Sequence, residues 1–503
     1  MKNQIFILAI LQILLSGKLP AQGNSSIEKC IPCEKLIDLK LPDVRITEAV
    51  TVISGTSHCK VLGVIGREIN FELLLPMEWK GIFVMGGGGG FVGSIQNSAR
   101  SAVNDGYATS GTDTGHESKN SPSADWALNN MERQLNFGHL AIHRTAEVSK
   151  AIIGSYYGSY PRYSYFIGCS RGGGQAMMEA QRYPDDFDGI VAGAPAFSWP
   201  AIAAECIQNT QAVYPVKLTE PVISGQHVKM LYEAVLKQCD MIDGVRDSII
   251  NNPAKCKFDF AVLLKCPGDV PGNGCFTSNQ IKAIKAIYDG IDFGNGISYP
   301  GFPPGGENET GGWQSWITGP NESIQKAAGY PSLHAYFGIE IFKYLILQNP
   351  DWNYSTYDFK GYEKEMRYAS AYLNATSTDY SGLKNRKGKI IFWHGWNDPA
   401  LSAFATIDHY NAVNAKDPDI NGYMRLFLLP GVLHCGGGEG PYQVDWIALI
   451  RGWVENNNAP ERIIVAKTIN GKEVMARPVY PFPAEAVYDG KGDPTKESSF
   501  MRK

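Results

Sequence analysis

The chain has 503 residues and a formal net charge of -4, with 44% hydrophobic and 19% charged residues. This composition is typical of a globular protein, and the length suits one large core with an inserted domain, or two or three small domains. No basic field exists to attract polyanions, so neither nucleic acid nor an anionic membrane surface is expected as a partner.

The first 21 residues have the pattern of a secretory signal peptide. Lys2 supplies a positive charge, an apolar run covers residues 5–15, and Ala21 closes a plausible cleavage site. The run is too short to span a bilayer comfortably, and a buried N-terminal strand or helix is the alternative. We therefore expect a secreted or periplasmic protein with no membrane attachment once the signal is removed.

Ten cysteines fit export, because an oxidising compartment favours disulfides and an even number permits complete pairing. Cys30 and Cys33 form a CxxC, but no second pair with histidines at zinc-finger spacing follows, so zinc is not expected. The sequence alone leaves the connectivity open.

The first part of the mature chain predicts an α/β sheet. Alternating apolar residues between 44 and 76 indicate antiparallel strands, and residues 81–85 indicate a short buried strand. That strand enters the glycine run 86–90, whose backbone N–H groups suit an oxyanion hole, with a sterically tight turn as the alternative. A helix over about 136–156 then leads to another strand, which is the repeating unit of a parallel sheet.

Asp113 and His116 lie in a polar loop between these elements. Members of a catalytic triad usually converge from separate loops, so two residues this close together are expected to fix the loop rather than to form a catalytic pair.

The stretch 168–172 has the sequence Gly-Cys-Ser-Arg-Gly, which matches the pattern G-x-S-x-G. A strand-like run, 163–167, precedes it, and a helix-compatible segment, 175–182, follows it. This context predicts that Ser170 sits on a tight turn with its hydroxyl projecting into a site. A glycine-serine loop without chemistry is the alternative.

The alternation of strand and helix fades after residue 197 and returns near residue 386, which indicates an inserted lid domain. Its aromatic residues suit an aromatic pocket or ordinary core packing: Trp313, Trp316, Tyr336, Phe337, Trp352 and Tyr357. Three carboxylates, Asp240, Asp243 and Asp247, lie around a glycine with backbone carbonyls between them. Calcium prefers such oxygen ligands, and a solvated acidic turn is an equal alternative.

Two further strands precede the remaining catalytic candidates. The strand that starts near residue 388 leads to Asp398, and the strand over 423–429 leads to His434. The order Ser170, Asp398, His434, each after a strand, is that of the α/β-hydrolases. We predict an α/β-hydrolase fold with a large inserted lid domain. Its parts are a signal peptide (1–21), a first catalytic part (22–197), the lid with the calcium site (198–385) and a second catalytic part (386–503).

Two cysteines narrow this class. Cys169 directly before Ser170 and Cys435 directly after His434, together with Asp398, resemble the Cys-Ser, Asp, His-Cys signature of the tannase and feruloyl esterase family, which includes mono(hydroxyethyl) terephthalate hydrolase. Further stretches agree with the family, and the similarity covers nearly all of the mature chain: 112–116, 183–196 and 394–399.

The resemblance implies a disulfide between Cys169 and Cys435 that holds Ser170 next to His434. By the same analogy three more disulfides are expected: Cys33 with Cys59, Cys239 with Cys256, and Cys266 with Cys275. The two cysteines that remain, Cys30 and Cys206, are paired by elimination. The resemblance also implies structural calcium in the lid, held by the ligand set Asp240, Asp243 and Asp247 side chains with Val245 and Ile249 carbonyls.

The chain departs from the family in three places. A C-terminal cysteine pair is missing, Gly88 stands where Asn is frequent, and Arg171 stands where Thr or Glu is frequent. The arginine either attracts a substrate carboxylate or faces solvent.

The expected function is that of a secreted serine esterase that hydrolyses esters of aromatic acids, such as feruloylated or galloylated plant material, through an acyl-enzyme. The oxyanion donors are expected to be the N–H groups of Arg171 and Gly89, and no organic cofactor is expected. A peptidase or acyltransferase with the same triad, or a non-catalytic calcium- and glycan-binding export protein, is the alternative.

Overall fold

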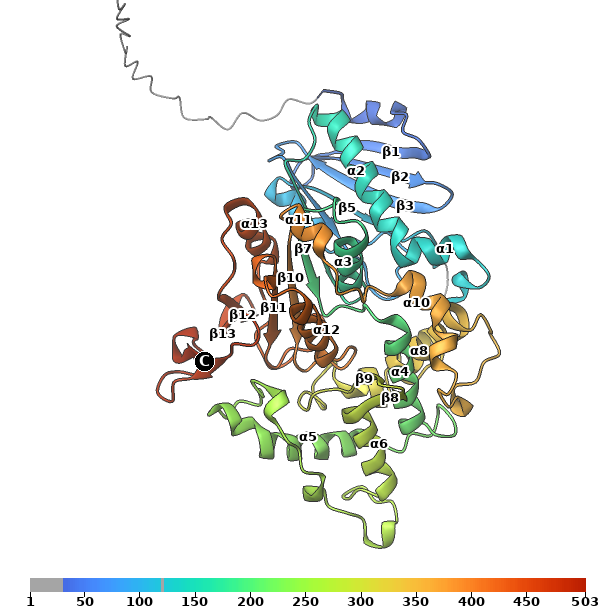
Figure 1. Cartoon of the computed structure of the whole chain (residues 1–503), viewed down its shortest axis with the longest axis vertical. Coiled ribbons are helices and arrows are strands. Elements are labelled where there is room, and N and C mark those ends of the chain that lie inside the picture. Colours follow the sequence, from blue (N-terminus) through green and yellow to red (C-terminus); the bar gives the residue numbers. More distant parts are fainter. Residues whose placement is uncertain (1–29, 119–121) are drawn as a thin grey trace, which may run out of the picture.

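The computed structural model of the chain describes residues 30–118 and 122–503, so the predicted signal peptide lies outside the described residues. A nine-stranded sheet runs through the molecule in the order β1-β2-β3-β5-β4-β6-β7-β10-β11 (Figure 1). Its strands are β1 (Val44–Val52), β2 (His58–Ile65), β3 (Ile69–Pro76), β4 (Ile82–Gly86), β5 (Ala108–Thr112), β6 (Tyr163–Cys169), β7 (Gly189–Gly193), β10 (Lys389–Gly395) and β11 (Met424–Leu429).

The sheet has an antiparallel start and a parallel remainder. Strands β1, β2, β3 and β5 pair antiparallel in turn, whereas β4, β6, β7, β10 and β11 run parallel to their neighbours. Both parts confirm the sequence prediction. Because β6, β10 and β11 run in the same direction, the loops at their carboxyl ends lie at one edge of the sheet.

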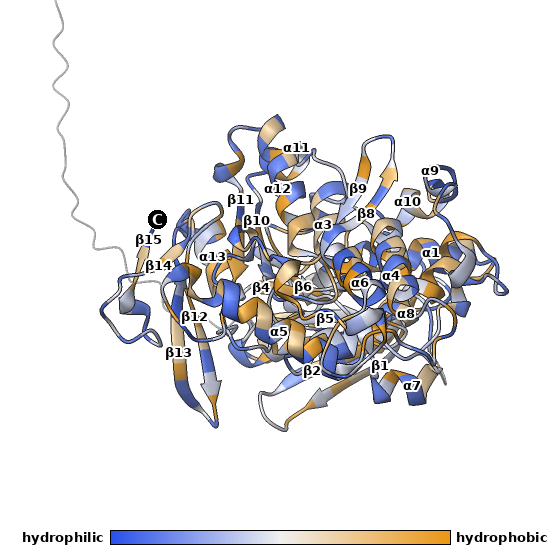
Figure 2. Ribbon diagram, turned by 90° about the horizontal axis from the view of Figure 1, so that it is seen from below, coloured by the Kyte–Doolittle hydropathy of each residue, from blue (hydrophilic) through white to orange (hydrophobic). Residues whose placement is uncertain are grey.

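The two faces of the sheet bury alternate side chains. Phe83 belongs to a core cluster that includes Met177 of α3, whereas its neighbour Val84 belongs to a second cluster that includes Ile450 and Trp453 of α13. Successive strand residues point to opposite faces, so an unbroken apolar strand needs a helical layer on each side. Figure 2 shows the apolar central strands surrounded by helices with mixed hydropathy.

Helices of the catalytic part precede and follow the central strands. The predicted helix over 136–156 begins with a π-helical turn, Asn136–Leu140, and continues as α2. The helices of this part are α1 (Met131–Leu135), α2 (Ala141–Tyr157), α3 (Arg171–Arg182), α12 (Ala403–Lys416) and α13 (Trp446–Asn456). The C-terminal region adds two small antiparallel pairs: β12 (Ile463–Ile469) with β13 (Lys472–Val479), and β14 (Ala486–Tyr488) with β15 (Phe500–Arg502).

The chain leaves the sheet after β7 and re-enters it at β10, and the segment between them lies mostly beyond the carboxyl ends of the parallel strands (Figure 1). It contains one small hairpin and the remaining helices: β8 (Gly290–Gly294), β9 (Ile297–Pro300), α4 (Trp199–Val213), α5 (Gly225–Cys239), α6 (Ser278–Asp289), α7 (Glu322–Ala328), α8 (Leu333–Glu340), α9 (Tyr362–Glu365), α10 (Arg367–Leu373) and α11 (Ser381–Asn385). Leu231, Ile284 and Trp313 belong to a separate apolar cluster of this segment, which we call the insertion.

Four disulfides are formed, and they match the pairs implied by the family resemblance: Cys33–Cys59, Cys169–Cys435, Cys239–Cys256 and Cys266–Cys275. The pairing of Cys30 with Cys206 is wrong. Cys30 is exposed and binds the end of α2 through its N–H, which donates to the carbonyl of Tyr156 at 2.8 Å, whereas Cys206 is buried in α4. Pairing by elimination assumes that every cysteine forms a disulfide, whereas these two thiols are free.

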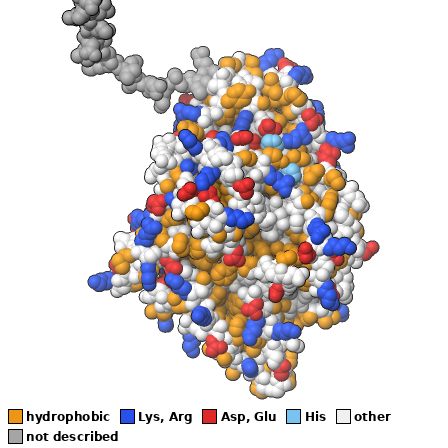
Figure 3. All heavy atoms as spheres, viewed as in Figure 1, with side chains coloured by type: hydrophobic (Ala, Val, Ile, Leu, Met, Phe, Trp, Pro, Cys, Tyr) orange, Lys and Arg blue, Asp and Glu red, His pale blue; other side chains and the backbone are white. Residues whose placement is uncertain are grey.

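On the face that Figure 3 shows, acidic and basic side chains are interspersed, in agreement with the small net charge. Within residues 30–118 and 122–503, none of the helices combines the length and apolar character that a membrane crossing requires.

Candidate active site

Ser170 occupies the turn between β6 and α3 with φ 63° and ψ -122°. A positive φ is costly for a residue with a Cβ, and it persists only where the surroundings enforce it. Here the Ser170 N–H donates to the Gly193 carbonyl at 3.0 Å, and the Ser170 carbonyl accepts from Ala196 at 2.9 Å. These bonds to the loop after β7 hold the serine in the strained turn that the G-x-S-x-G motif predicts.

Glycines around the serine permit a close approach of backbones. A Cβ on Gly168 would lie 2.5 Å from backbone atoms of Gly172, and a Cβ on Gly173 would lie 2.2 Å from the carbonyl oxygen of Gly193. Neither contact is sterically possible, so these positions require glycine for α3 to start directly against the sheet.

Asp398 and His434 are hydrogen-bonded at the carboxyl ends of β10 and β11. The Nδ1–H of His434 donates to Oδ2 of Asp398 at 2.8 Å, which leaves Nε2 as the free acceptor. The other oxygen, Oδ1, accepts from the N–H groups of Ala400 at 2.8 Å and Leu401 at 3.0 Å. Burial raises the pKa of Asp398, but the charge and hydrogen bonds of the neighbouring histidines outweigh it and hold that pKa well below its usual range.

His394 is a second histidine on the same carboxylate, and the sequence analysis did not single it out. It is fully buried, and its Nδ1 lies 2.9 Å from the hydroxyl of Thr406. Its Nε2 lies between two acceptors, 3.0 Å from the carbonyl oxygen of Leu401 and 3.2 Å from Oδ2 of Asp398. The signal in the sequence is a histidine at the end of the strand that delivers Asp398, four residues before it.

The Cys169–Cys435 disulfide joins the residue before Ser170 to the residue after His434, with Cα atoms 5.9 Å apart. It therefore links the end of β6 to the loop after β11, although the two cysteines are separated by 266 positions.

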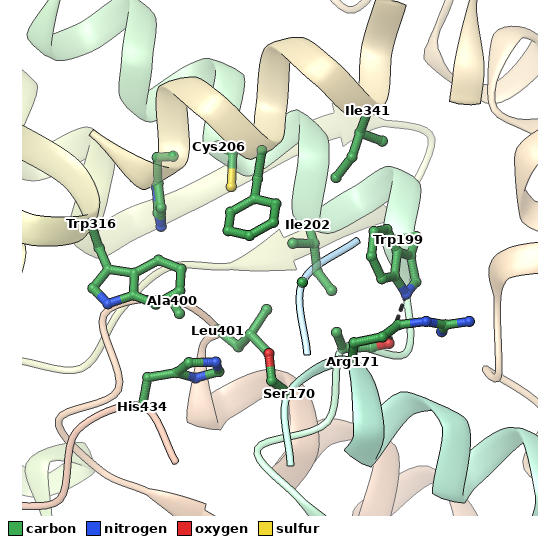
Figure 4. Close-up of a pocket in the computed structure, with 14 residues that line it drawn as sticks. Ser170, Arg171, Trp199, Ile202, Cys206, Trp316, Ile341, Ala400, Leu401 and His434 are labelled. Atoms are coloured by element: carbon green, nitrogen blue, oxygen red, sulfur yellow. Dashed lines mark hydrogen bonds between the residues drawn. The ribbon is translucent and has the colours of Figure 1, made fainter. Parts of the chain in front are cut away.

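Ser170 and His434 line one cavity beneath the insertion (Figure 4). The ring of Trp316 packs edge to face against the ring of His434, with the ring centroids 5.0 Å apart. It also stacks on the ring of Phe337, with a centroid distance of 6.2 Å. Of the six aromatic residues considered from sequence, these two line the cavity. The other four pack elsewhere: Trp313 against Tyr288, Tyr336 against Phe91, and Trp352 and Tyr357 against Phe342.

In the glycine run after β4, the N–H group expected to be an oxyanion donor is already hydrogen-bonded. The N–H of Gly89 donates to the side-chain oxygen of Gln96 at 2.7 Å, and that of Gly88 donates to Gln175 at 3.1 Å. Gly89 is therefore not free to bind an oxyanion, which corrects the sequence-based assignment. Gly90 is the glycine of this run that lines the cavity.

The side chain of Arg171 neither faces solvent nor enters the cavity. The residue is 1% exposed, and its guanidinium donates to the carbonyls of Phe137 and Gly138. Its Cζ lies over two aromatic rings, 4.4 Å from the centroid of Phe137 and 5.1 Å from that of Trp199. Figure 4 shows it extending away from Ser170 past Trp199. The alternative in which this arginine faces solvent is therefore wrong, and two of its nitrogens, Nε and Nη1, are buried without a hydrogen-bond partner.

Asp113 and His116 are buried and engaged with the loop, as predicted. Asp113 accepts from the N–H groups of Asn70 at 3.0 Å and Gly115 at 2.8 Å. His116 donates to the carbonyl of Phe91 at 2.9 Å and stacks on Trp126 at 3.7 Å.

The acidic turn after α5 has unpaired carboxylate oxygens, although its three carboxylates do not all lie within 4.8 Å of one another. Oδ1 of Asp240 and Oδ2 of Asp243 are buried without a hydrogen-bond partner. Burial raises the pKa of both groups, that of Asp243 to about 6, and the neighbouring carboxylate of Asp247 adds to this. Asp247 itself pairs with Arg477 and accepts from the N–H of Ile249 at 3.1 Å. Buried carboxylate oxygens that lack a donor are the ligands that calcium takes.

The strand order, the strained serine after β6 and the hydrogen-bonded Asp398 and His434 define an α/β-hydrolase. The family model described as tannase and feruloyl esterase matches residues 53–503. The chain belongs to the tannase and feruloyl esterase family, and it is a carboxylic ester hydrolase.

Relatives support this placement along most of the chain. A probable feruloyl esterase of Arthroderma benhamiae is 32% identical, over 86% of this chain and 82% of its own. A mono(2-hydroxyethyl) terephthalate hydrolase of Piscinibacter sakaiensis is 30% identical, over 88% and 84%. The crystal structure of an esterase from Aspergillus oryzae superimposes with a TM-score of 0.84 at 25% identity, and covers 94% of this chain and 99% of its own.

Proposed function

We propose that this chain hydrolyses esters of aromatic carboxylic acids through a serine-bound acyl intermediate. One observation carries the proposal: Ser170 on a strained turn and His434, hydrogen-bonded to Asp398, line a single cavity with aromatic walls. The names of the relatives, feruloyl esterase and terephthalate half-ester hydrolase, favour aromatic acids.

In this mechanism the Oγ of Ser170 attacks the ester carbonyl while Nε2 of His434 takes its proton. The same nitrogen returns the proton to the leaving alcohol, and Asp398 orients and stabilises the imidazolium. Water then repeats the sequence on the acyl-enzyme and releases the acid.

The oxyanion donors in this proposal are the backbone N–H groups of Arg171 and Gly90. Arg171 is the first residue of α3, where N–H groups have no intrahelical partner, and Gly90 lines the cavity beside Ser170. Loss of one such donor typically raises the barrier by about 2.7 to 4 kcal/mol.

The test is the pair wild type and Ser170→Ala on a chromogenic aryl ester, with a fluorophosphonate probe as a second readout. We expect labelling and hydrolysis in the wild type and neither in the variant, with unchanged thermal unfolding. Full activity in Ser170→Ala would contradict the proposal. Peptide substrates and alcohol acceptors in the same assay distinguish a peptidase or acyltransferase.

We also propose a calcium ion in the insertion and export of the chain. The side chains of Asp240, Asp243 and Asp247 with the carbonyls of Val245 and Ile249 would hold the ion, whose contribution is structural. The four disulfides support an oxidising compartment, which is secreted or periplasmic.

A further inference from the structure

The cavity beside Ser170 offers almost nothing that binds a polar substituent. Apart from the two catalytic candidates, its wall is mainly apolar: Trp199, Ile202, Trp316, Phe337, Ile341 and Leu401. The indole N–H of Trp199 is occupied, because it donates to the carbonyl of Ala196 at 2.9 Å. Besides the indole N–H of Trp316, the polar side chains that remain in the wall are those of Arg171, His334 and Cys206.

Arg171 is the only one of these three that carries a permanent charge, and its guanidinium is directed elsewhere. It donates to the carbonyls of Phe137 and Gly138, beneath the ring of Trp199. Figure 4 shows Trp199 and the Arg171 side chain on the same side, with the guanidinium beyond the ring. A carboxylate in the cavity would therefore not reach it.

His334 has no free ring nitrogen. The side-chain amide of Asn209 lies 3.3 Å from Nδ1 as its donor, and Nε2 donates to the carbonyl of Pro399 at 3.0 Å. Burial lowers the pKa of His334 to about 4, so the ring is neutral near pH 7. It presents carbon atoms, not a hydrogen-bonding group, to a ligand.

Cys206 projects into the cavity from α4, on the side opposite Ser170 (Figure 4). It is a free thiol, and burial raises its pKa, so it stays protonated. A neutral buried thiol is a weak donor and packs as a small apolar group.

From these contacts we infer that the cavity selects uncharged aromatic acyl groups with few free hydroxyls, such as cinnamoyl, methoxycinnamoyl or benzoyl. It discriminates against galloyl groups and against acids that carry a second, ionised carboxylate, as a terephthalate half-ester does. The inference rests on the proposed function, in which this cavity receives the acyl group. The physical reason is that a carboxylate or hydroxyl would lose its water and find no partner.

Matched methyl esters test the selectivity, because the alcohol stays the same. We expect kcat/KM to be at least about 100-fold higher for dimethyl than for monomethyl terephthalate. For methyl cinnamate over methyl caffeate we expect about 10-fold, and for methyl benzoate over methyl gallate about 100-fold, because an apolar pocket rejects added hydroxyls only moderately. Ratios below about 3 in the terephthalate and gallate pairs would overturn the inference.

A binding assay separates selectivity from catalysis. In Ser170→Ala, which cannot form the acyl-enzyme, isothermal titration calorimetry measures ester binding alone. We expect methyl cinnamate to bind at least about 10-fold more tightly than monomethyl terephthalate.

The two assays fail in different ways. If methyl cinnamate binds to Ser170→Ala more tightly than monomethyl terephthalate but the wild type hydrolyses none of the esters, the proposed function is wrong and the inferred selectivity of the cavity holds. If the esters are hydrolysed but monomethyl terephthalate binds as tightly as methyl cinnamate, the inference is overturned.

Discussion

Cys169 and Cys435 are bonded to each other directly beside Ser170 and His434, so one covalent link fixes the serine's strand to the histidine's loop. The fixed geometry matters because proton transfer between serine and histidine requires hydrogen-bond distance in the reacting complex.

The first prediction concerns this disulfide. We expect the double variant Cys169→Ser with Cys435→Ser to lose about 2 to 5 kcal/mol of unfolding free energy and about 10- to 100-fold in kcat. Cys266→Ser with Cys275→Ser, which opens a disulfide with a separation of 9 in the insertion, is the matched control. The control should lose stability but keep kcat. Equal kcat in both double variants would show that the first disulfide has no positioning effect.

The second prediction concerns His394, which lies against the same oxygen of Asp398 as His434 does. His394→Ala removes a donor from a buried carboxylate, so kcat should fall about 10-fold while KM stays constant. His394→Gln, which retains a donor, should recover part of the loss. A change in KM alone, measured by steady-state kinetics, would contradict a positioning role.

The third prediction concerns acid stability. Burial lowers the pKa of His116, His139, His334 and His409 to about 4, below the ordinary value near 6.5. The unfolded chain therefore takes up protons first as the pH falls, and stability is lost between about pH 6.5 and 4. For the fully buried His334 the loss at pH 5 is about 2 kcal/mol.

Urea denaturation at a series of pH values measures this effect. His409→Gln removes one titrating group and should flatten the slope of unfolding free energy against pH by about one proton. A slope that is unchanged in this variant would mean that His409 is already charged in the folded protein.

The fourth prediction concerns calcium. We expect a chelator to lower the midpoint of thermal unfolding, and calcium at about 100 times its dissociation constant to stabilise the chain by about 2.7 kcal/mol. Asp243→Asn should abolish this response. Asp185→Asn, which removes the same charge from a side chain that is 95% exposed, should retain it. A calcium response that survives in Asp243→Asn would place the ion elsewhere.

The fifth prediction concerns Arg171. Arg171→Met should keep contact with Phe137 and Trp199 but lose the hydrogen bonds that the guanidinium donates to the carbonyls of Phe137 and Gly138, so we expect a loss of about 1.5 to 3 kcal/mol in unfolding free energy. The ratio of kcat/KM for dimethyl and monomethyl terephthalate should not change, because the guanidinium does not meet the acyl group. A selective loss for the charged ester would contradict its orientation.

Residues tied to strand ends could be predicted from sequence. Ser170, Asp398 and His434 each follow an apolar strand, and parallel strands bring such positions to one edge of a sheet. His394 could not be assigned a role, because nothing in the sequence shows that a side chain within the strand turns toward Asp398. Only the structure shows that its Nε2 lies 3.2 Å from Oδ2 of Asp398.

Two of the wrong predictions concern residues whose hydrogen-bond partners come from other segments of the chain. Whether Gly89 is free depends on Gln96, and the direction of Arg171 depends on the carbonyls of Phe137 and Gly138, which come from another part of the chain. The pairing of Cys30 with Cys206 rested on parity alone, and parity carries no information about distance.

The insertion and the sheet contribute different things to the cavity. Ser170 and His434 stand on loops of the sheet, whereas Cys206, Trp316 and Phe337 come from the insertion, between β7 and β10. Substitutions in the insertion can therefore retune which acid is accepted while the reacting groups stay in place.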